Sequence, residues 1–331
     1  MTFDLASLGW DDSFAAAYRP HDLRGQQPAR VSRVDRGVCT VLTRNGSLRA
    51  SLAGRMLCAI ADDPLRLPCV GDWVVARTWP DDRVTVEAVL PRRSAVVRNS
   101  AARDSLGQVL AANLDIAAVV EPMEPSPDSG RVERLLALAH KSGAQPAVIL
   151  TKSDLAADPR AVAEQVADAA PGVPVHAVSA ATGDGMAELR GFLGAGTTAL
   201  LGPSGCGKSS LVNALAGATV MATRPRRVDR KGRHTTTYRA LVPMPSGGAV
   251  LDTPGLRAVG LFDTGPGLER AFADIEVLAA GCRFADCVHD QEPDCAVRAA
   301  IDSGDLPARR LASWRKLRRE HAWESRRRRG R

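Results

Sequence analysis

The sequence predicts an α/β protein in which a mostly parallel sheet follows a small all-β barrel and precedes a helical region. Three observations support this fold class. Apolar strand-like runs alternate with helix-like stretches between about residues 115 and 243, an order typical of parallel sheets. Short apolar runs separated by turn signals occupy 29–97. After Leu261 the pattern becomes helical around a cluster of cysteines.

The composition is that of a globular protein of two or three domains. The chain has 331 residues, of which 45% are hydrophobic, enough to form at least one sizeable core. No apolar run reaches the roughly 18 residues that a membrane span needs. The first ten residues lack the basic and apolar regions of a secretory signal. The composition therefore predicts a cytoplasmic protein with no membrane partner.

The first hundred residues predict a barrel. One short amphipathic helix is expected between Leu5 and Tyr18. Strand signals at 38–43 and 48–52 flank Asn45-Gly46, and those at 73–78 and 84–89 flank a turn at 80–82. An OB-fold fits this size and spacing. A β-sandwich is the alternative that the pattern leaves open.

The middle of the chain predicts βαβ units. Strand signals lie at 116–120, 147–150, 173–178, 197–201 and 249–251, and helix signals lie at 132–141, 161–169 and 208–215. Strands connected through helices lie parallel. Ligands bind such sheets at the carboxyl ends of the strands, so the loops there are expected to carry the chemistry.

A glycine-rich loop lies between the predicted strand at 197–201 and the predicted helix at 208–215. It matches the P-loop pattern of phosphate-binding proteins at every required position. Its predicted nucleotide-binding residues are Gly202, Pro203, Ser204, Gly205, Cys206, Gly207, Lys208, Ser209 and Ser210. We expect backbone N–H groups to face phosphate oxygens, Lys208 to contact the β- and γ-phosphates, and Ser209 to bind Mg²⁺.

A second phosphate-responsive element follows the strand at 249–251, where the chain reads Asp252-Thr253-Pro254-Gly255. Asp252 can orient the ligands of Mg²⁺, and Gly255 can donate its N–H to the γ-phosphate. ABC-type ATPases have similar P-loops, but their LSGGQ-like signature and their Asp-Glu strand end are absent from this sequence. The sequence therefore predicts a nucleoside triphosphatase with a switch element.

Base recognition is predicted after the strand at 147–150, by Thr151, Lys152, Ser153 and Asp154. The Asp154 carboxylate can accept two hydrogen bonds from guanine that adenine does not offer, and Lys152 can lie across the ring. Ser179 and Ala180 resemble the GTPase element that contacts guanine O6 through a backbone N–H. GTPases usually have Asn at the position of Thr151, so an ATPase or a broad purine triphosphatase is an alternative.

The order of these motifs differs from that of ordinary GTPases, which have the P-loop first and the base-reading motif last. Here the residues at 151–154 and 179–180 precede Gly202. The same sheet can form when the chain begins and ends at another point of the fold, which changes the order of the motifs along the sequence. We therefore predict a circularly permuted P-loop GTPase domain. The segment after Gly255 then leads directly into the C-terminal region. Exchange of bound GTP for GDP can therefore shift the position of that region.

The cysteines predict a metal site. Seven cysteines in a chain without a signal sequence argue against a disulfide framework. Four soft ligands lie within fourteen residues, namely Cys282, Cys287, His289 and Cys295. Three thiolates and one imidazole suit a closed, tetrahedral, structural Zn²⁺ site with one ion per chain. The polar residues between them disfavour the alternative, small core cysteines beside a surface histidine.

Two segments are strongly basic. Six basic residues lie within 224–233, directly before His234, Thr235 and Thr236. Eleven lie from Arg309 to the C-terminus, against two glutamates. We expect Thr235 or Thr236 to complete the Mg²⁺ ligands and the basic residues to contact RNA phosphates, with a solvated loop and tail as the alternative.

These residues together closely resemble the RsgA (YjeQ) family of small ribosomal subunit biogenesis GTPases. The resemblance covers the OB-like region, the permuted motifs, the run at 232–236 and the cysteine spacing at 281–295. It implies a protein that binds GTP and GDP and contacts the small (30S) ribosomal subunit late in maturation. It also implies contacts with 16S rRNA through the OB and zinc domains, and release upon subunit-stimulated GTP hydrolysis.

The catalytic residues expected are Lys208, Ser209 and His234. Leu256 stands where Ras-like enzymes have a water-positioning Gln, a substitution that the family shares. His234 is therefore the candidate for orienting the water, with a plain surface histidine as the alternative. A nucleotide-gated RNA-binding factor without catalysis is the other reading that Leu256 leaves open.

The predicted organisation is a monomer with four regions. These are a lead-in at 1–28, an OB-fold RNA-binding domain at 29–98, the permuted GTPase domain at 99–262, and a small helical zinc-binding domain with a basic tail at 263–331.

Overall fold

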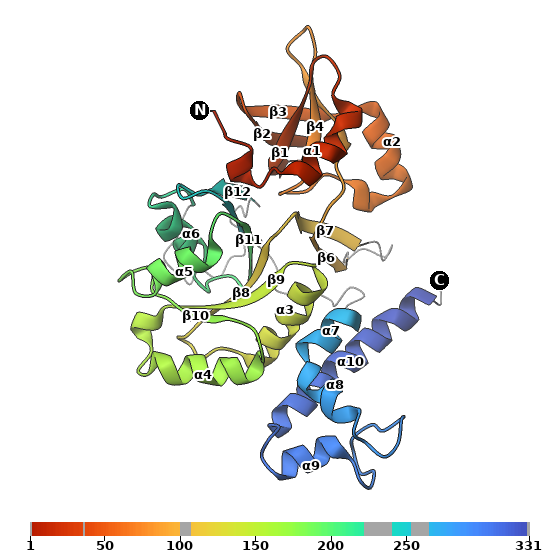
Figure 1. The fold of residues 1–331 in the computed structure, drawn as a ribbon, viewed down its shortest axis with the longest axis vertical. Coiled ribbons are helices and arrows are strands. Elements are labelled where there is room, and N and C mark those ends of the chain that lie inside the picture. The colour runs from red at the N-terminus through yellow and green to blue at the C-terminus, as the bar shows by residue number, and fades with distance from the viewer. Residues whose placement is uncertain (1, 36, 100–106, 222–239, 253–264, 330–331) are drawn as a thin grey trace, which may run out of the picture.

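The computed structural model describes residues 2–35, 37–99, 107–221, 240–252 and 265–329. A barrel, a sheet domain and a group of C-terminal helices follow one another along its longest axis (Figure 1). Among these residues, strands of the first two parts join in an eleven-stranded sheet of order β10-β9-β8-β11-β13-β12-β1-β2-β3-β5-β4. The predicted succession of all-β, α/β and helical parts is confirmed.

The N-terminal part is a barrel. Its strands are β1 (Gln26–Asp35), β2 (Val38–Thr43), β3 (Gly46–Leu52), β4 (Trp73–Thr78) and β5 (Val84–Val89). β1 pairs with both β2 and β4, and β3 pairs with β5, so the strands close on themselves. Because the strands close, the N-terminal part is a barrel, and the alternative of a β-sandwich is wrong. The sequence pattern did not indicate α2 (Gly54–Asp62) and η3 (Pro64–Arg66), which lie between β3 and β4.

The N-terminal segment packs on the barrel beside Trp73. The helix predicted between Leu5 and Tyr18 is divided into η1 (Ala6–Leu8) and α1 (Asp12–Tyr18), and η2 (Arg19–His21) follows. Gly9 separates η1 from α1 with a φ of 88°, a left-handed conformation that costs glycine little. Phe14 and Trp73 pack with ring centroids 5.8 Å apart, so this segment belongs to the core.

Five parallel strands form the centre of the middle part. They are β8 (Ile116–Pro122), β9 (Gln145–Thr151), β10 (Val175–Ala177), β11 (Thr197–Leu201) and β13 (Ala249–Asp252). Each lies within two residues of its predicted bounds. β12 (Ala240–Pro243) pairs antiparallel with β13 and was not predicted.

Helices cover both faces of this sheet because its strands are apolar on both sides. On β8, Ala117 and Val119 face the core that includes α3 (Ser129–Lys141) and α4 (Pro159–Ala169). Ala118 and Val120 face α5 (Met186–Leu193) and α6 (Lys208–Ala216). The short helix η4 (Ser153–Leu155) follows β9.

Two features join the barrel to the sheet domain. β1 pairs with β12 through Arg33 and Ala240. The buried Arg30 of β1 donates to the carbonyls of Gly71 and Asn113, and burial lowers its pKa to about 10. A separate hairpin of β6 (Ala95–Asn99) and β7 (Gly107–Ala112) connects the two parts along the chain.

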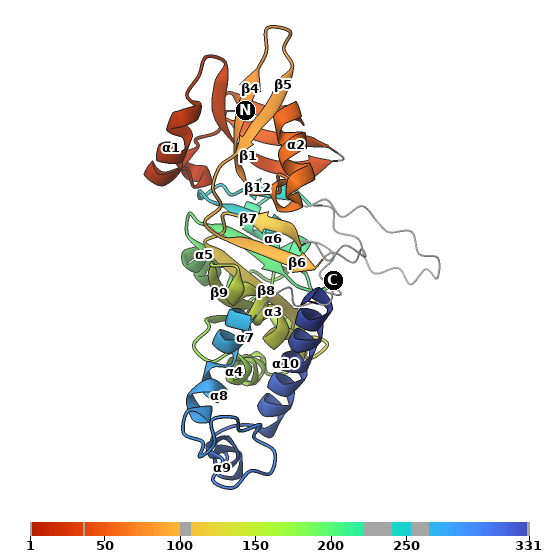
Figure 2. The ribbon, with the colours of Figure 1, turned by 90° about the vertical axis from the view of Figure 1, so that its right-hand side faces the viewer.

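The C-terminal part contains α7 (Gly265–Ala271), α8 (Ala273–Ala279), α9 (Ala296–Asp302) and α10 (Ala308–Arg329). α10 runs beside α3 (Figure 2). Arg310 of α10 is fully buried and bonds Glu133 of α3 at 3.0 Å and Asp274 of α8 at 2.7 Å. It also donates to the carbonyls of Ala169 and Ala271. This guanidinium therefore ties the C-terminal helices to the sheet domain.

Several of the basic C-terminal side chains bind groups of the protein itself. Arg309 and Arg310 both pair with Glu133, and Arg315 donates to the carbonyls of Val288 and His289. A count of charges from sequence therefore overstates what α10 offers to a partner. Within the described ranges, no helix combines the length and apolar character needed to cross a bilayer.

Candidate nucleotide site and metal centre

The P-loop connects β11 to α6 and wraps tightly. A side chain at Gly202 would place its Cβ 2.3 Å from the carbonyl oxygen of Val120. Gly207, at the start of α6, has a φ of 95°. The buried Lys208 donates from Nζ to the carbonyls of Gly202 (3.0 Å) and Pro203 (2.7 Å). Its ammonium group thus lies within the loop, where phosphate oxygens can replace these carbonyls as its hydrogen-bond acceptors.

A hydroxyl and a buried carboxylate meet beside the loop. Ser209 Oγ lies 3.4 Å from Oδ2 of Asp252, which ends β13. Oδ1 of Asp252 is buried and has no hydrogen-bond partner among the described residues. Burial raises the pKa of Asp252, and the Lys208 charge opposes that rise. An unpartnered carboxylate oxygen beside a hydroxyl fits the oxygen ligands that Mg²⁺ prefers.

The base-reading residues also come together at this edge of the sheet. Asp154 is exposed within η4, and its Oδ1 accepts a 2.5 Å hydrogen bond from Ser179 Oγ. Ser153 donates its N–H to the carbonyl of Val178, which joins the loops after β9 and β10. Lys152 adopts a φ of 60°, and the exposed Ala180 follows Ser179.

Thr151 connects the base-reading loop to the P-loop. Its buried hydroxyl donates to the carbonyl of Cys206 at 2.5 Å. The sequence predicted Thr151 as a base-reading residue, at a position where GTPases usually have Asn. The structure gives it a direct contact with the phosphate-binding segment.

The sequence pattern did not indicate Glu121 and Arg131, whose charges lie near Cys206 of the P-loop. Glu121 is fully buried at the end of β8 and binds Arg131 of α3 through two bonds, at 2.5 and 2.6 Å. This pairing raises the pKa of Arg131 against the effect of burial. The sequence feature that could have indicated this buried ion pair is the carboxylate directly after the apolar run at 116–120. His234, Thr235, Thr236 and Gly255 lie outside the described residues.

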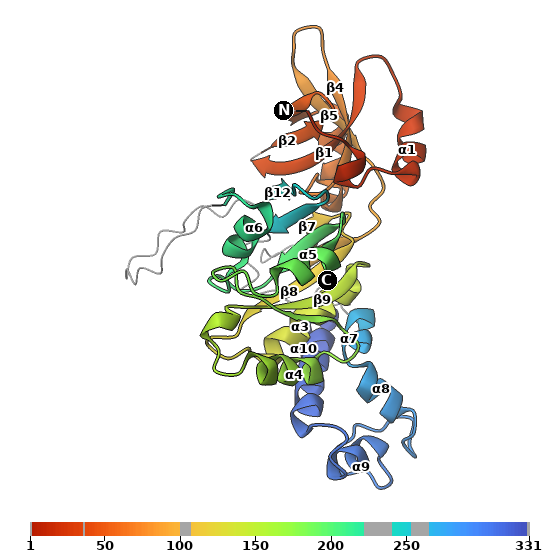
Figure 3. The ribbon, with the colours of Figure 1, turned by 60° about the vertical axis from the view of Figure 1, so that its left-hand side comes forward.

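The predicted metal ligands form one cluster between α8 and α9, at the end of the molecule opposite the barrel (Figure 3). The ligand atoms of Cys282, Cys287, His289 and Cys295 all lie within 4.8 Å of one another. His289 Nδ1 is 3.5 Å from the sulfurs of Cys282 and Cys295, which are 3.8 Å apart. Tetrahedral sulfur ligands at about 2.3 Å from one ion are themselves about 3.8 Å apart.

The electrostatics of the cluster also suit a metal ion. Burial lowers the pKa of His289, which favours the neutral imidazole that binds metals. Burial opposes ionisation of Cys282, but hydrogen bonds from the N–H groups of Val297 and Ala296, together with the contacts with Cys295 and Cys287, lower the pKa of this thiol. Burial raises the pKa of Cys287 to about 11, so a metal ion would have to displace the proton of that thiol on binding. The residues present can therefore hold a metal ion.

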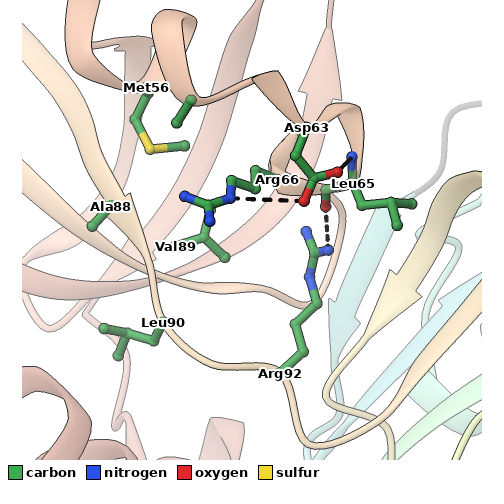
Figure 4. A pocket seen from close by; sticks show the side chains of 9 residues that line it. Met56, Asp63, Leu65, Arg66, Ala88, Val89, Leu90 and Arg92 are labelled. Atoms are coloured by element: carbon green, nitrogen blue, oxygen red, sulfur yellow. Dashed lines mark hydrogen bonds and ion pairs between the residues drawn. The ribbon is translucent and has the colours of Figure 1, made fainter. Parts of the chain in front are cut away.

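A pocket of about 410 Å³ lies elsewhere, against the barrel (Figure 4). Met56, Ala88 and Leu90 line it together with charged side chains that are already paired. Arg92 binds Asp72 and the Leu65 carbonyl, and Arg66 pairs with Asp63. The P-loop and the cysteine cluster are therefore the candidate sites.

Comparisons with known proteins agree with this geometry. The model of the family described as RsgA GTPase matches residues 89–262. A relative from Streptomyces coelicolor, named small ribosomal subunit biogenesis GTPase RsgA, is 53% identical over 96% of this chain and 86% of its own. A relative of the same name from Opitutus terrae is 43% identical over 98% and 91%, respectively.

Two solved structures show the same fold. YjeQ from Thermotoga maritima covers 90% of this chain and 99% of its own, with a TM-score of 0.63 and 24% identity. YloQ, described as a circularly permuted GTPase, covers 91% and 97% with a TM-score of 0.61 and 24% identity. The predicted permutation and enzyme class are confirmed. The chain belongs to the RsgA GTPase family and hydrolyses GTP.

Proposed function

We propose that this GTPase binds the small (30S) ribosomal subunit late in its maturation, hydrolyses GTP when the subunit stimulates it, and is then released. The observation that carries the proposal is the 53% identity, over nearly the whole chain, to a relative named for small ribosomal subunit biogenesis. We propose that it acts in the cytoplasm, as a monomer.

The P-loop, Ser209 and Asp252 would bind the triphosphate and its Mg²⁺. The geometry that supports this is the Lys208 ammonium inside the loop and the open Oδ1 of Asp252. The ion would neutralise charge on the phosphates. Thr235 or Thr236 would complete its ligands, and Gly255 would contact the γ-phosphate.

Asp154 would read guanine, with Lys152 across the ring and the Ala180 N–H at O6. In Asp154→Asn an amide donor would face guanine's own donors, while the remaining oxygen still accepts from Ser179. We expect GTP affinity to fall about 10- to 150-fold, as for a lost hydrogen bond to a charged group. Affinity for xanthosine triphosphate, whose O2 can accept, should rise.

Titration with both nucleotides measures this change. Asp168→Asn, at an exposed carboxylate of α4, is the matched control. Affinities that Asp154→Asn leaves unchanged would show that Asp154 does not read the base.

The cysteine cluster would hold a structural Zn²⁺. Its three thiols and one imidazole fill all four positions of a tetrahedral ion, which leaves none for a substrate. We further propose that the chain is organised as a lead-in at 1–28, a barrel at 29–98, a GTPase region at 99–262 and a C-terminal region at 263–331. The barrel and the C-terminal region would both contact 16S rRNA. The remaining positive charge of α10 supports such a contact.

Binding and turnover with isolated 30S subunits test the ribosomal role. We expect nucleotide-dependent co-sedimentation and strong stimulation of GTP hydrolysis, both weakened by salt because it screens phosphate contacts. If 30S subunits neither bind the GTP form nor accelerate turnover, the ribosomal role is wrong.

His234→Ala tests the catalytic residue within that role. Because Leu256 cannot hold the attacking water, we expect the variant to keep GTP and subunit binding but lose most of the stimulation. Stimulation equal to that of the wild type would exclude a catalytic role for His234 and leave the ribosomal role standing.

A further inference from the structure

Charged side chains hold the N–H and C=O groups of the turn around the metal ligand His289. His289 has a φ of 60°, in the left-handed region that residues with a side chain seldom adopt. The Glu292 carboxylate accepts hydrogen bonds from the N–H groups of Val288 at 2.9 Å and Asp290 at 2.7 Å. Nη2 of Arg315 donates to the carbonyls of Val288 at 3.2 Å and His289 at 2.5 Å. Contacts outside the four ligands therefore fix this turn.

The conformation of the turn decides where the imidazole points. Nδ1 of His289 lies 3.5 Å from the sulfurs of both Cys282 and Cys295. Only the χ1 and χ2 torsions separate this ring nitrogen from the backbone, so a rotation of the backbone moves Nδ1 directly. The buried ring of Trp314, whose centroid lies 5.4 Å from that of the imidazole, limits how far the side chain can compensate.

We propose that Arg315 is a positioning residue of the metal centre, which holds the carbonyls of the turn so that Nδ1 of His289 faces the sulfurs. This inference rests on the proposed zinc site. Two successive carbonyls that point at one nitrogen repel each other, and the positive guanidinium offsets that repulsion. Arg315 lies on α10, 26 residues after His289, so the spacing of the four ligands gives no sign of it.

Loss of the guanidinium should weaken metal binding. Without it, the two carbonyls can turn towards water and His289 can leave the left-handed conformation. Groups that orient a metal ligand typically change metal affinity about 10- to 100-fold. We expect Arg315→Met to weaken Zn²⁺ binding by that factor, measured by competition with a chromogenic chelator in the reduced, full-length protein. The side chain is 34% exposed, so methionine should fit there. Arg315→Lys, which keeps a charged donor, should recover part of the affinity.

Arg318→Met is the matched control. Arg315 and Arg318 both place positive charge near His289. Arg318 is exposed, and its guanidinium lies over the ring of Trp314 at 4.5 Å. Its substitution removes the same charge but keeps the hydrogen bonds of the turn, so Zn²⁺ affinity should stay close to that of the wild type.

A double-mutant cycle tests whether Arg315 acts through His289. The ligand is absent in His289→Ala, so the addition of Arg315→Met should cause little further loss of Zn²⁺ affinity. The visible absorption of bound Co²⁺ reports the ligands of the ion. In Arg315→Met this absorption should shift towards that of His289→Ala.

Zn²⁺ affinity in Arg315→Met equal to that of the wild type would overturn the proposal. An equal loss in Arg318→Met would overturn it too, because the effect would then belong to charge. So would a full further loss in the His289→Ala background, since Arg315 would then stabilise the region without acting on the ligand. Wild-type protein that binds no Zn²⁺ would refute the zinc site itself and the role of Arg315 with it, whereas a failure confined to the Arg315 variants leaves the zinc site standing.

Discussion

Lys208→Ala is expected to lower the rate of GTP hydrolysis about 100- to 1,000-fold, the effect of removing one group that stabilises developing charge. Lys208 is the cation at the centre of the P-loop, and its contacts in the free protein are carbonyl oxygens that phosphate can replace. Ser209→Ala is expected to lose most hydrolysis as well, because the Mg²⁺ ligand is removed.

Single-turnover rates with and without 30S subunits measure the effect of both substitutions. Melting temperatures without nucleotide provide the control, because Lys208 is buried and its loss can loosen the loop. Turnover at the wild-type rate in either variant would be incompatible with the assigned roles.

Loss of the metal ion is expected to unfold the C-terminal helices. The cluster lies in the connection between α8 and α9, and structural zinc contributes about 10–16 kcal/mol to the folding of small zinc peptides. Metal analysis should find about one zinc per chain, and Cys287→Ser should lower it. Hydrogen exchange should then become faster in 265–329 than in the barrel.

Cys58→Ser is the matched control, because Cys58 is exposed on α2, far along the chain from the cluster. It should leave both the metal content and the exchange pattern unchanged. Wild-type protein that is fully folded without metal would contradict the structural role.

Features with a local signature could be predicted from the sequence. Apolar runs gave the parallel strands, the glycine spacing gave the P-loop, and four ligands within fourteen residues gave the metal cluster. The bond from Thr151 to Cys206 and the pair of Arg310 with Glu133 could not be predicted, since their partners are 55 and 177 residues apart. α2 was missed because it interrupts a run of strands whose turn signals dominate the pattern.

The buried Arg310 has a consequence for dissecting this protein. A fragment that ends at residue 262 would keep every predicted nucleotide-binding residue but lose the guanidinium that neutralises Glu133. The face of α3 that packs on α7 would meet water together with Glu133, and the core that α3 shares with Leu268 and Phe272 of the C-terminal part would be opened. The catalytic segment is thus not a detachable module, because part of its core comes from the helices that follow it, although no predicted nucleotide ligand does.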